Sequence, residues 1–278
     1  SVAVGAQARY AGDNSIEQEK TMRLLACVGL LSVLSVGLAR AGEEAPPAKR
    51  PPLELTEGWG TIEGQFILDG EPPRPAAPIP NPRAGAPIPD ERLLIDPETR
   101  GIQNVVIYLK KSPSTVHPDL QKSEKPKVSL KGDNSQFKPR VLHVRTDQVV
   151  RFDSADGVNY HVNVLPLSNP PVGFITHAGQ DPVERTFRKP ESLPVSVKSD
   201  LYAWMQAYLV VTDHPYVAIT DKDGRFRIEG LPAGEHGFTV WHEQAGYIER
   251  LMTVEARSKE ARVLPAVKVP LEMLRRAK

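Results

Sequence analysis

The residues of this chain best suited to metal chemistry are its histidines, which are His117, His143, His161, His177, His214, His236 and His242. Neutral imidazole suits both Cu(II) and Zn(II), so three or four of them converging in space would make a metal site. His214 and His242 are the better candidates, because each ends a strand-like segment, and Glu243 adds a carboxylate beside His242. A histidine-based copper site is therefore one open alternative.

Arrangements that would support catalysis are incomplete in this sequence. Trp241-His-Glu243 lacks the second histidine of a His-Glu-x-x-His zinc motif. Ser199 stands beside Asp200 without a histidine base nearby in sequence, which disfavours a nucleophilic role. Asp221-Lys-Asp-Gly224 is not followed by a carboxylate at EF-hand spacing, so it predicts a turn. We expect a protein that is not an enzyme.

Aromatic side chains offer a different kind of site. Five of them gather in the same segments of the sequence: Trp204, Tyr208, Tyr216, Trp241 and Tyr247. Aromatic residues near strand ends usually belong to a core, yet exposed aromatic faces also bind sugars or peptides. The expected partner is an envelope protein or a glycan. Nucleic acid is not expected, because 35 basic and 34 acidic residues leave no broad basic field.

The elements that must position these residues are short strands, separated by turns that contain Gly and Pro. Tyr160 to Val164 alternates, which places His161 and Asn163 on one face and the apolar residues on the other. The pattern predicts strands at 61–68, 104–109, 141–145, 149–152, 160–164, 195–198, 207–211, 217–220, 225–228, 237–241 and 247–254. This spacing favours an all-β sandwich. Strands 217–220 and 225–228 are expected to form a hairpin.

The N-terminal segments indicate export. Residues 1–21 are polar and are interpreted as a spurious or disordered extension. Residues 22–41 resemble a signal peptide, with a 15-residue apolar run followed by a small-x-small cleavage site. The only cysteine of the sequence, Cys27, lies in this apolar run. A Pro-rich linker is expected over 42–58. The expected location is periplasmic or extracellular, with no transmembrane segment after signal removal.

The C-terminal part resembles a known module. Thr220-Asp-Lys-Asp-Gly-Arg-Phe and the following Leu231-Pro-Ala-Gly234 are similar to the repeated pattern of carboxypeptidase-regulatory-like, transthyretin-like modules. These belong with carbohydrate-binding-like folds and are non-catalytic. The resemblance implies a small β-module over 213–270, followed by a charged tail at 271–278.

The preceding part resembles the cupredoxins. Ser199-x-x-Tyr202-x-x-Met205 keeps the Cys-x-x-His-x-x-Met spacing of an amicyanin-like copper loop, and His161 matches the first copper histidine. The resemblance implies a Greek-key β-sandwich over 59–212, in a bacterial secreted protein of the methylamine-utilisation type. It also implies electron transfer through copper.

Two of the four implied ligands are replaced in this sequence. Ser199 occupies the thiolate position and Tyr202 the position of the second histidine, while a blue-copper site depends on a short copper–sulfur bond. We therefore expect a non-enzymatic binding or structural protein with no bound cofactor. The alternative is a histidine-based copper-binding or electron-transfer protein.

Overall fold

The computed structural model describes residues 51–81 and 86–275, and these ranges fall within one compact unit of the chain. The predicted extension, the signal peptide and the first part of the linker lie outside the described residues, as do the last three residues of the tail. Within the described ranges, the chain forms no helix with the length and apolarity needed to cross a bilayer. Nearly all regular structure is β, so the all-β prediction is confirmed.

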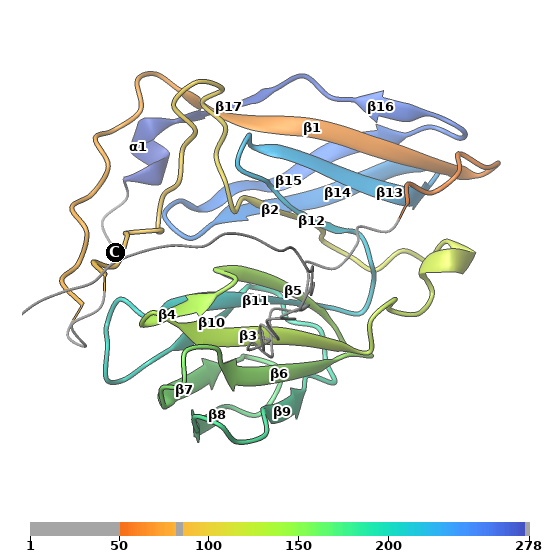
Figure 1. Ribbon diagram of the computed structural model, residues 1–278. Coiled ribbons are helices and arrows are strands. Elements are labelled where there is room, and N and C mark those ends of the chain that lie inside the picture. The colour runs from red at the N-terminus through yellow and green to blue at the C-terminus, as the bar shows by residue number, and fades with distance from the viewer. Residues whose placement is uncertain (1–50, 82–85, 276–278) are drawn as a thin grey trace, which may run out of the picture. The chain divides into compact units, whose positions relative to one another are not determined.

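The middle of the described chain forms a two-sheet sandwich, which we call the central lobe (Figure 1). One sheet has the order β5-β11-β10-β7-β8 and the other β4-β3-β6-β9. Its strands are β3 (Lys127–Asp133), β4 (Gln136–Lys138), β5 (Val141–Arg145), β6 (Val149–Ser154), β7 (Tyr160–Leu165), β8 (Val172–Thr176), β9 (Val183–Thr186), β10 (Val195–Lys198) and β11 (Gln206–Thr212). A short 3-10 helix, η1 (Pro118–Leu120), precedes them.

Alternation along β7 fixes which side chains enter the core of the central lobe. Tyr160, Val162 and Val164 are buried in that core, whereas His161 and Asn163 are only half-buried on the opposite face. This matches the predicted pattern, because successive side chains of a strand point to opposite faces of its sheet.

The two ends of the described chain form a second sandwich, which we call the outer lobe (Figure 1). One sheet has the order β13-β1-β16, with β17 also pairing with β1, and the other has the order β12-β2-β14-β15. The elements are β1 (Trp59–Asp69), β2 (Val106–Leu109), β12 (Val217–Ile219), β13 (Arg225–Pro232), β14 (Gly234–His242), β15 (Gly246–Ala256), β16 (Ala261–Val263), β17 (Val267–Pro270) and α1 (Leu271–Leu274).

The sheet pairing differs from the boundaries predicted by the sequence. The sequence places 59–109 in the first sandwich, but β1 pairs with β13 and β2 pairs with β12 and β14. The apolar side chains of β1, including Ile62 and Phe66, accordingly fill the core of the outer lobe. The outer lobe is thus built from both ends of the described chain, with the central lobe inserted between β2 and β12.

The predicted hairpin between 217–220 and 225–228 is also corrected. The turn itself forms, because Gly224 has φ +74° and its N–H donates to the Asp221 carbonyl at 3.0 Å. However, the Gly224 carbonyl accepts a hydrogen bond from the Phe66 N–H at 2.8 Å, so the turn docks on β1. β12 and β13 then continue into different sheets, and the turn serves as a corner between two layers.

The lobes meet along two strands that are buried on both faces. Every residue of β2 is buried, as are six of the seven residues of β11. Ile107 and Leu209 face the cores of their own lobes, while Tyr108 and Tyr208 join a third apolar cluster between the lobes. Its buried members are Val106, Tyr108, Val141, Tyr208, Val210 and Trp241.

A buried ion pair closes one end of this interface. Arg140 directly precedes β5, and Glu243 directly follows β14. The guanidinium Nε and one terminal nitrogen donate to the two carboxylate oxygens at 2.8 and 2.6 Å. The two side chains are only 8% and 2% exposed, so each charge depends on the other for its solvation.

Removing one partner of this pair should destabilise the fold far more than removing both. We expect Arg140→Met to lower the free energy of unfolding by about 3–5 kcal/mol, because it leaves the Glu243 carboxylate buried without its counter-charge. Arg140→Met combined with Glu243→Leu should restore most of that loss. Urea denaturation at pH 7 measures both values.

The exposed ion pair between Arg257 and Glu255 provides the control, since Arg257→Ala should change stability little. A double variant as unstable as Arg140→Met alone would contradict this account of the buried pair.

Candidate functional site

The 199–205 loop, which by sequence resembles a copper-ligand loop, connects β10 to β11 and is closed by its own backbone hydrogen bonds. The Ser199 N–H donates to the Met205 carbonyl at 3.1 Å, and the Met205 N–H donates to the Tyr202 carbonyl at 3.0 Å. Met205 is 1% exposed and packs in the core of the central lobe. The loop is therefore held by hydrogen bonds and by one buried side chain.

The structure brings His161 next to this loop. The imidazole Nδ1 accepts a hydrogen bond from the Asp200 N–H at 3.3 Å, and Nε2 lies 3.8 Å from the Asp200 carboxylate. Asn163, on the same face of β7, donates to that carboxylate at 2.6 Å. The Ser199 hydroxyl accepts the N–H of Leu201 at 3.3 Å.

These residues do not fit a type-1 copper ion. The position for the thiolate holds a hydroxyl that already accepts a backbone hydrogen bond, and the His161 Nδ1 accepts the N–H of Asp200. The soft sulfur anion that such an ion requires is missing from this donor set.

The other metal candidates do not assemble into a centre. His242 is buried, and its Nδ1 accepts the N–H of Gln244 at 3.2 Å, while Glu243 is engaged by Arg140. His214 is buried too, with its ring stacked on Tyr216. Across residues 51–81 and 86–275, no group of three or more His, Cys, Asp or Glu side chains is placed to hold a metal ion.

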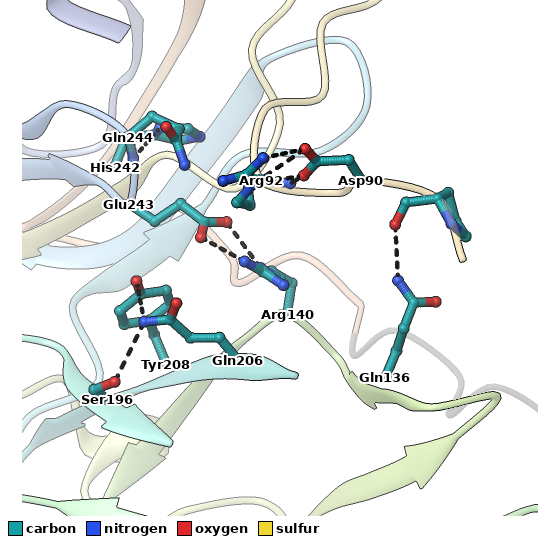
Figure 2. A network of polar contacts seen from close by, with 11 residues as sticks. Asp90, Arg92, Gln136, Arg140, Ser196, Gln206, Tyr208, His242, Glu243 and Gln244 are labelled. Carbon is teal, nitrogen blue, oxygen red and sulfur yellow. Dashed lines mark hydrogen bonds and ion pairs between the residues drawn. The ribbon is translucent and has the colours of Figure 1, made fainter. Parts of the chain in front are cut away.

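A cleft of about 520 Å³ lies beside the interlobe ion pair. The loop that precedes β2 contributes Asp90 and Arg92, the central lobe contributes Gln136 and Gln206, and Gln244 follows β14 (Figure 2). The remaining lining residues are Ile79, Ile88, Pro89, Glu91, Arg140, Ala203, Trp204, Glu243 and Arg275. The cleft is therefore assembled from segments of both lobes.

Two guanidinium–carboxylate pairs, Arg92–Asp90 and Arg140–Glu243, are among the residues that line this cleft (Figure 2). The Arg92 Nε donates to Asp90 at 2.8 Å, and this hydrogen bond holds the pKa of the Asp90 carboxyl below its ordinary value. The charges of Arg140 and Glu243 act on Asp90 and Arg92 respectively, so the two pairs are electrostatic neighbours. The Asp90 carboxyl is thus held in the ionised form.

A buried tyrosine supports the polar side chains of the cleft. Gln206 donates to the Tyr208 hydroxyl at 2.6 Å and to the Ser196 hydroxyl at 3.4 Å (Figure 2). Burial raises the pKa of Tyr208 to about 12, and the negative charge of Glu243 acts in the same direction. The phenol therefore stays neutral and fixes the orientation of the Gln206 amide.

Trp204 belongs to the 199–205 loop and also lines the cleft. The side chain is half-buried, and its indole N–H donates to the Ser135 carbonyl at 3.0 Å. Its ring lies 5.1 Å from that of Tyr202, and Trp204 lines the cleft together with Ala203. The loop that resembles a copper-ligand loop thus forms one wall of a cavity.

The other aromatic candidates divide between cores and a second cavity. Tyr208 and Trp241 pack edge to face in the interlobe cluster, and Tyr216 is buried in the outer lobe. Tyr247 lines a separate cavity of about 440 Å³, where Arg250 lies 4.1 Å over its ring. Of the five predicted aromatic residues, only Trp204 lines the cleft.

The sequence gives little sign of the cleft residues. Asp90, Arg92 and Gln136 carry no motif, and they come together only because the Pro-rich segment after β1 folds back on both lobes. One usable signal is the Pro-rich stretch at 72–89, which predicts a long loop that packs over a sheet. Among its described residues, the backbones of Ile79 and Ile88 exchange two hydrogen bonds.

Comparisons with known proteins add a likeness of fold over part of the chain. No family model and no curated protein matches the sequence. A segment covering 32% of this chain is similar to a Cu-containing nitrite reductase from Thermus scotoductus SA-01, with 19% identity, a TM-score of 0.27 and 23% of that chain covered. A mutant amicyanin in its reduced Cu(I) form is similar at 13% identity, with the same TM-score, over 32% of this chain and 86% of its own. At these values the likenesses assign neither a family nor a function.

Burial of His242 predicts a specific loss of stability in acid. Burial lowers the pKa of His242 to about 4, whereas an unfolded chain has a histidine pKa of about 6.5. Between these pH values the unfolded state binds a proton that the folded state does not, so stability falls as pH falls. This one group should cost about 2 kcal/mol between pH 7 and pH 5.

Denaturation of wild type and of His242→Gln at both pH values isolates this contribution. The variant should lose less stability in acid than wild type, and His177→Gln, at an exposed histidine, should not differ from wild type. Equal acid sensitivity in all three proteins would assign the loss to other groups.

Proposed function

We propose that this protein is an exported, non-enzymatic binding protein with a cupredoxin-like sandwich, whose former copper loop now forms part of a ligand-binding cleft. The observation that carries the proposal is the loop itself. Ser199 and Met205 are used in internal hydrogen bonds and core packing, while Trp204 of the same loop lines the cleft.

The chemistry of the cleft supports recognition over catalysis. Asp90 and Glu243 each accept hydrogen bonds from a guanidinium group, and the pKa of the Asp90 carboxyl is lowered by its bond to Arg92. General acid–base catalysis needs a group that can exchange a proton near the working pH. Paired charges and oriented amides instead provide fixed hydrogen-bonding groups, as binding sites do.

The loop hypothesis predicts that copper binding can be restored. Ser199→Cys combined with Tyr202→His would supply a thiolate and a second imidazole near His161 and Met205. We expect this double variant to bind Cu(II) with intense visible absorption from the copper–sulfur bond, and wild type to show no such band. Optical titration with Cu(II) measures both.

Ser199→Ala combined with Tyr202→His is the matched control, because it has the added imidazole but no sulfur. A correctly folded Cys/His variant without colour would contradict the assignment of this loop. A strong blue complex of the wild-type protein would contradict the proposed loss of copper.

Ligand binding in the cleft is tested by thermal shift. A panel of sugars, amino acids, dipeptides, nucleotides and polyamines is screened against wild type and Ala203→Arg, which places a long side chain at an exposed position of the cleft wall. A ligand at about 100 times its Kd adds about 2.7 kcal/mol, which raises Tm by roughly 5–10 °C in a domain of this size.

We expect at least one compound to stabilise wild type and not Ala203→Arg. Ala178→Arg, outside the cleft lining, serves as the control and should keep the response. Compounds that stabilise all three proteins equally would place binding elsewhere, and a panel without any stabilising compound would count against the proposed function.

A further inference from the structure

We infer that the interlobe cleft binds an uncharged saccharide of two or three rings. This inference rests on the proposed function and names the chemical class of its ligand. Three observations carry it: the balance of charge in the lining, the kinds of polar side chain that line it, and one aromatic wall.

The charges that line the cleft cancel. Its carboxylates are Asp90, Glu91 and Glu243, and its guanidinium groups are Arg92, Arg140 and Arg275, which is three of each sign. Four of these six groups are tied in the two bidentate pairs described above. The remaining two, Glu91 and Arg275, are of opposite sign, so the lining has no net charge to offset the cost of desolvating a ligand of either sign. A neutral ligand avoids this cost.

The polar side chains that line the cleft suit hydrogen bonding to pairs of neighbouring hydroxyl groups. Carboxylates, guanidinium groups and amides are planar and present two donors or acceptors side by side. Gln136, Gln206 and Gln244 add three amides, of which Gln206 uses both N–H groups within the protein and keeps its oxygen as an acceptor. Vicinal hydroxyls of a sugar donate and accept in the same way, so such a lining can satisfy them without any net charge.

These polar groups are also held in place before a ligand arrives. The Gln206 amide donates to Tyr208 and Ser196, and the Gln136 amide donates to the Pro89 carbonyl at 3.2 Å. Side chains with fixed orientation lose little entropy on binding, which favours affinity for a small polar ligand.

Trp204 supplies the apolar wall. Its indole is fixed by the hydrogen bond to Ser135 and by contact with Tyr202. The C–H face of a pyranose ring is apolar, and it packs on an aromatic face while the hydroxyls point to polar groups at its edge. The volume of about 520 Å³ lies within the usual range of about 300–1,000 Å³ for small-molecule sites.

Tryptophan fluorescence and calorimetry test the inference with the full chain. The probes are maltose, cellobiose, sucrose, N,N′-diacetylchitobiose and their trisaccharide homologues, with digalacturonic acid and chitosan disaccharide as charged counterparts. We expect at least one neutral sugar to bind and to change the Trp204 emission. The charged counterparts should bind at least about tenfold more weakly, because a lining without net charge does not offset the desolvation of their charge.

Variants distinguish the cleft from other surfaces. Trp204→Ala should weaken sugar binding at least about tenfold, and Trp204→Phe should keep most of it, since the phenyl ring preserves an apolar face. Gln244→Ala should weaken binding, whereas the exposed amide variant Gln180→Ala should not. Circular dichroism verifies that each variant is folded, and Ala203→Arg provides a second block of the site.

The outcomes separate the two proposals. Sugar binding that survives both Trp204→Ala and Ala203→Arg would overturn the inference. Cleft binding of an amino acid, peptide or nucleotide, without binding of any sugar, would overturn the saccharide class and leave the proposed binding function intact. A cleft that binds nothing in either experiment would overturn both.

Discussion

The double burial of β2 and β11 is the constraint on which the rest of this structure depends. Each strand turns one face to the core of its own lobe and the other face to the opposite lobe. A strand buried on both faces must be a continuous apolar run. Val105-Val-Ile-Tyr-Leu109 and Ala207-Tyr-Leu-Val-Val211 have that composition. Separation of the lobes would expose both runs, so the lobes are expected to unfold together.

The buried Arg140–Glu243 pair helps to set the alignment of the two lobes across this apolar contact. Hydrophobic burial alone does not fix how two sheets are aligned, whereas a bidentate ion pair has one favourable geometry. Its residues flank β5 and β14, two strands that contribute to the interlobe cluster. The pair therefore fixes the alignment of the lobes at the end of the interface where the cleft lies. Because Arg140 and Glu243 also line the cleft, the same contact that joins the lobes holds part of the cleft lining in place.

The local sequence pattern predicts most of the strands, because the alternation of apolar and polar residues, and the Gly or Pro residues that end a strand, act over only a few residues. It does not predict their partners. β1 pairs with β13, more than 150 residues later, and the Asp221–Gly224 turn separates its strands instead of pairing them.

The inability of local sequence pattern to predict long-range contacts also explains which site residues were predicted. His161 and the Ser199–Met205 loop are near each other on adjacent strands, whereas Arg92, Gln136 and Gln244 meet only through long-range folding.

The 199–205 loop is held by hydrogen bonds and by core packing. A copper-ligand loop has to aim soft donors at an ion, but here Met205 fills the core and the backbone of Ser199 and Tyr202 completes the turn. These contacts hold the loop at the end of β10 and β11 and present Trp204 to the cleft from a fixed base. An aromatic wall is useful for recognition only when its position is set before binding. The loop that carries Trp204 is thus fixed by its own hydrogen bonds and by the packing of Met205.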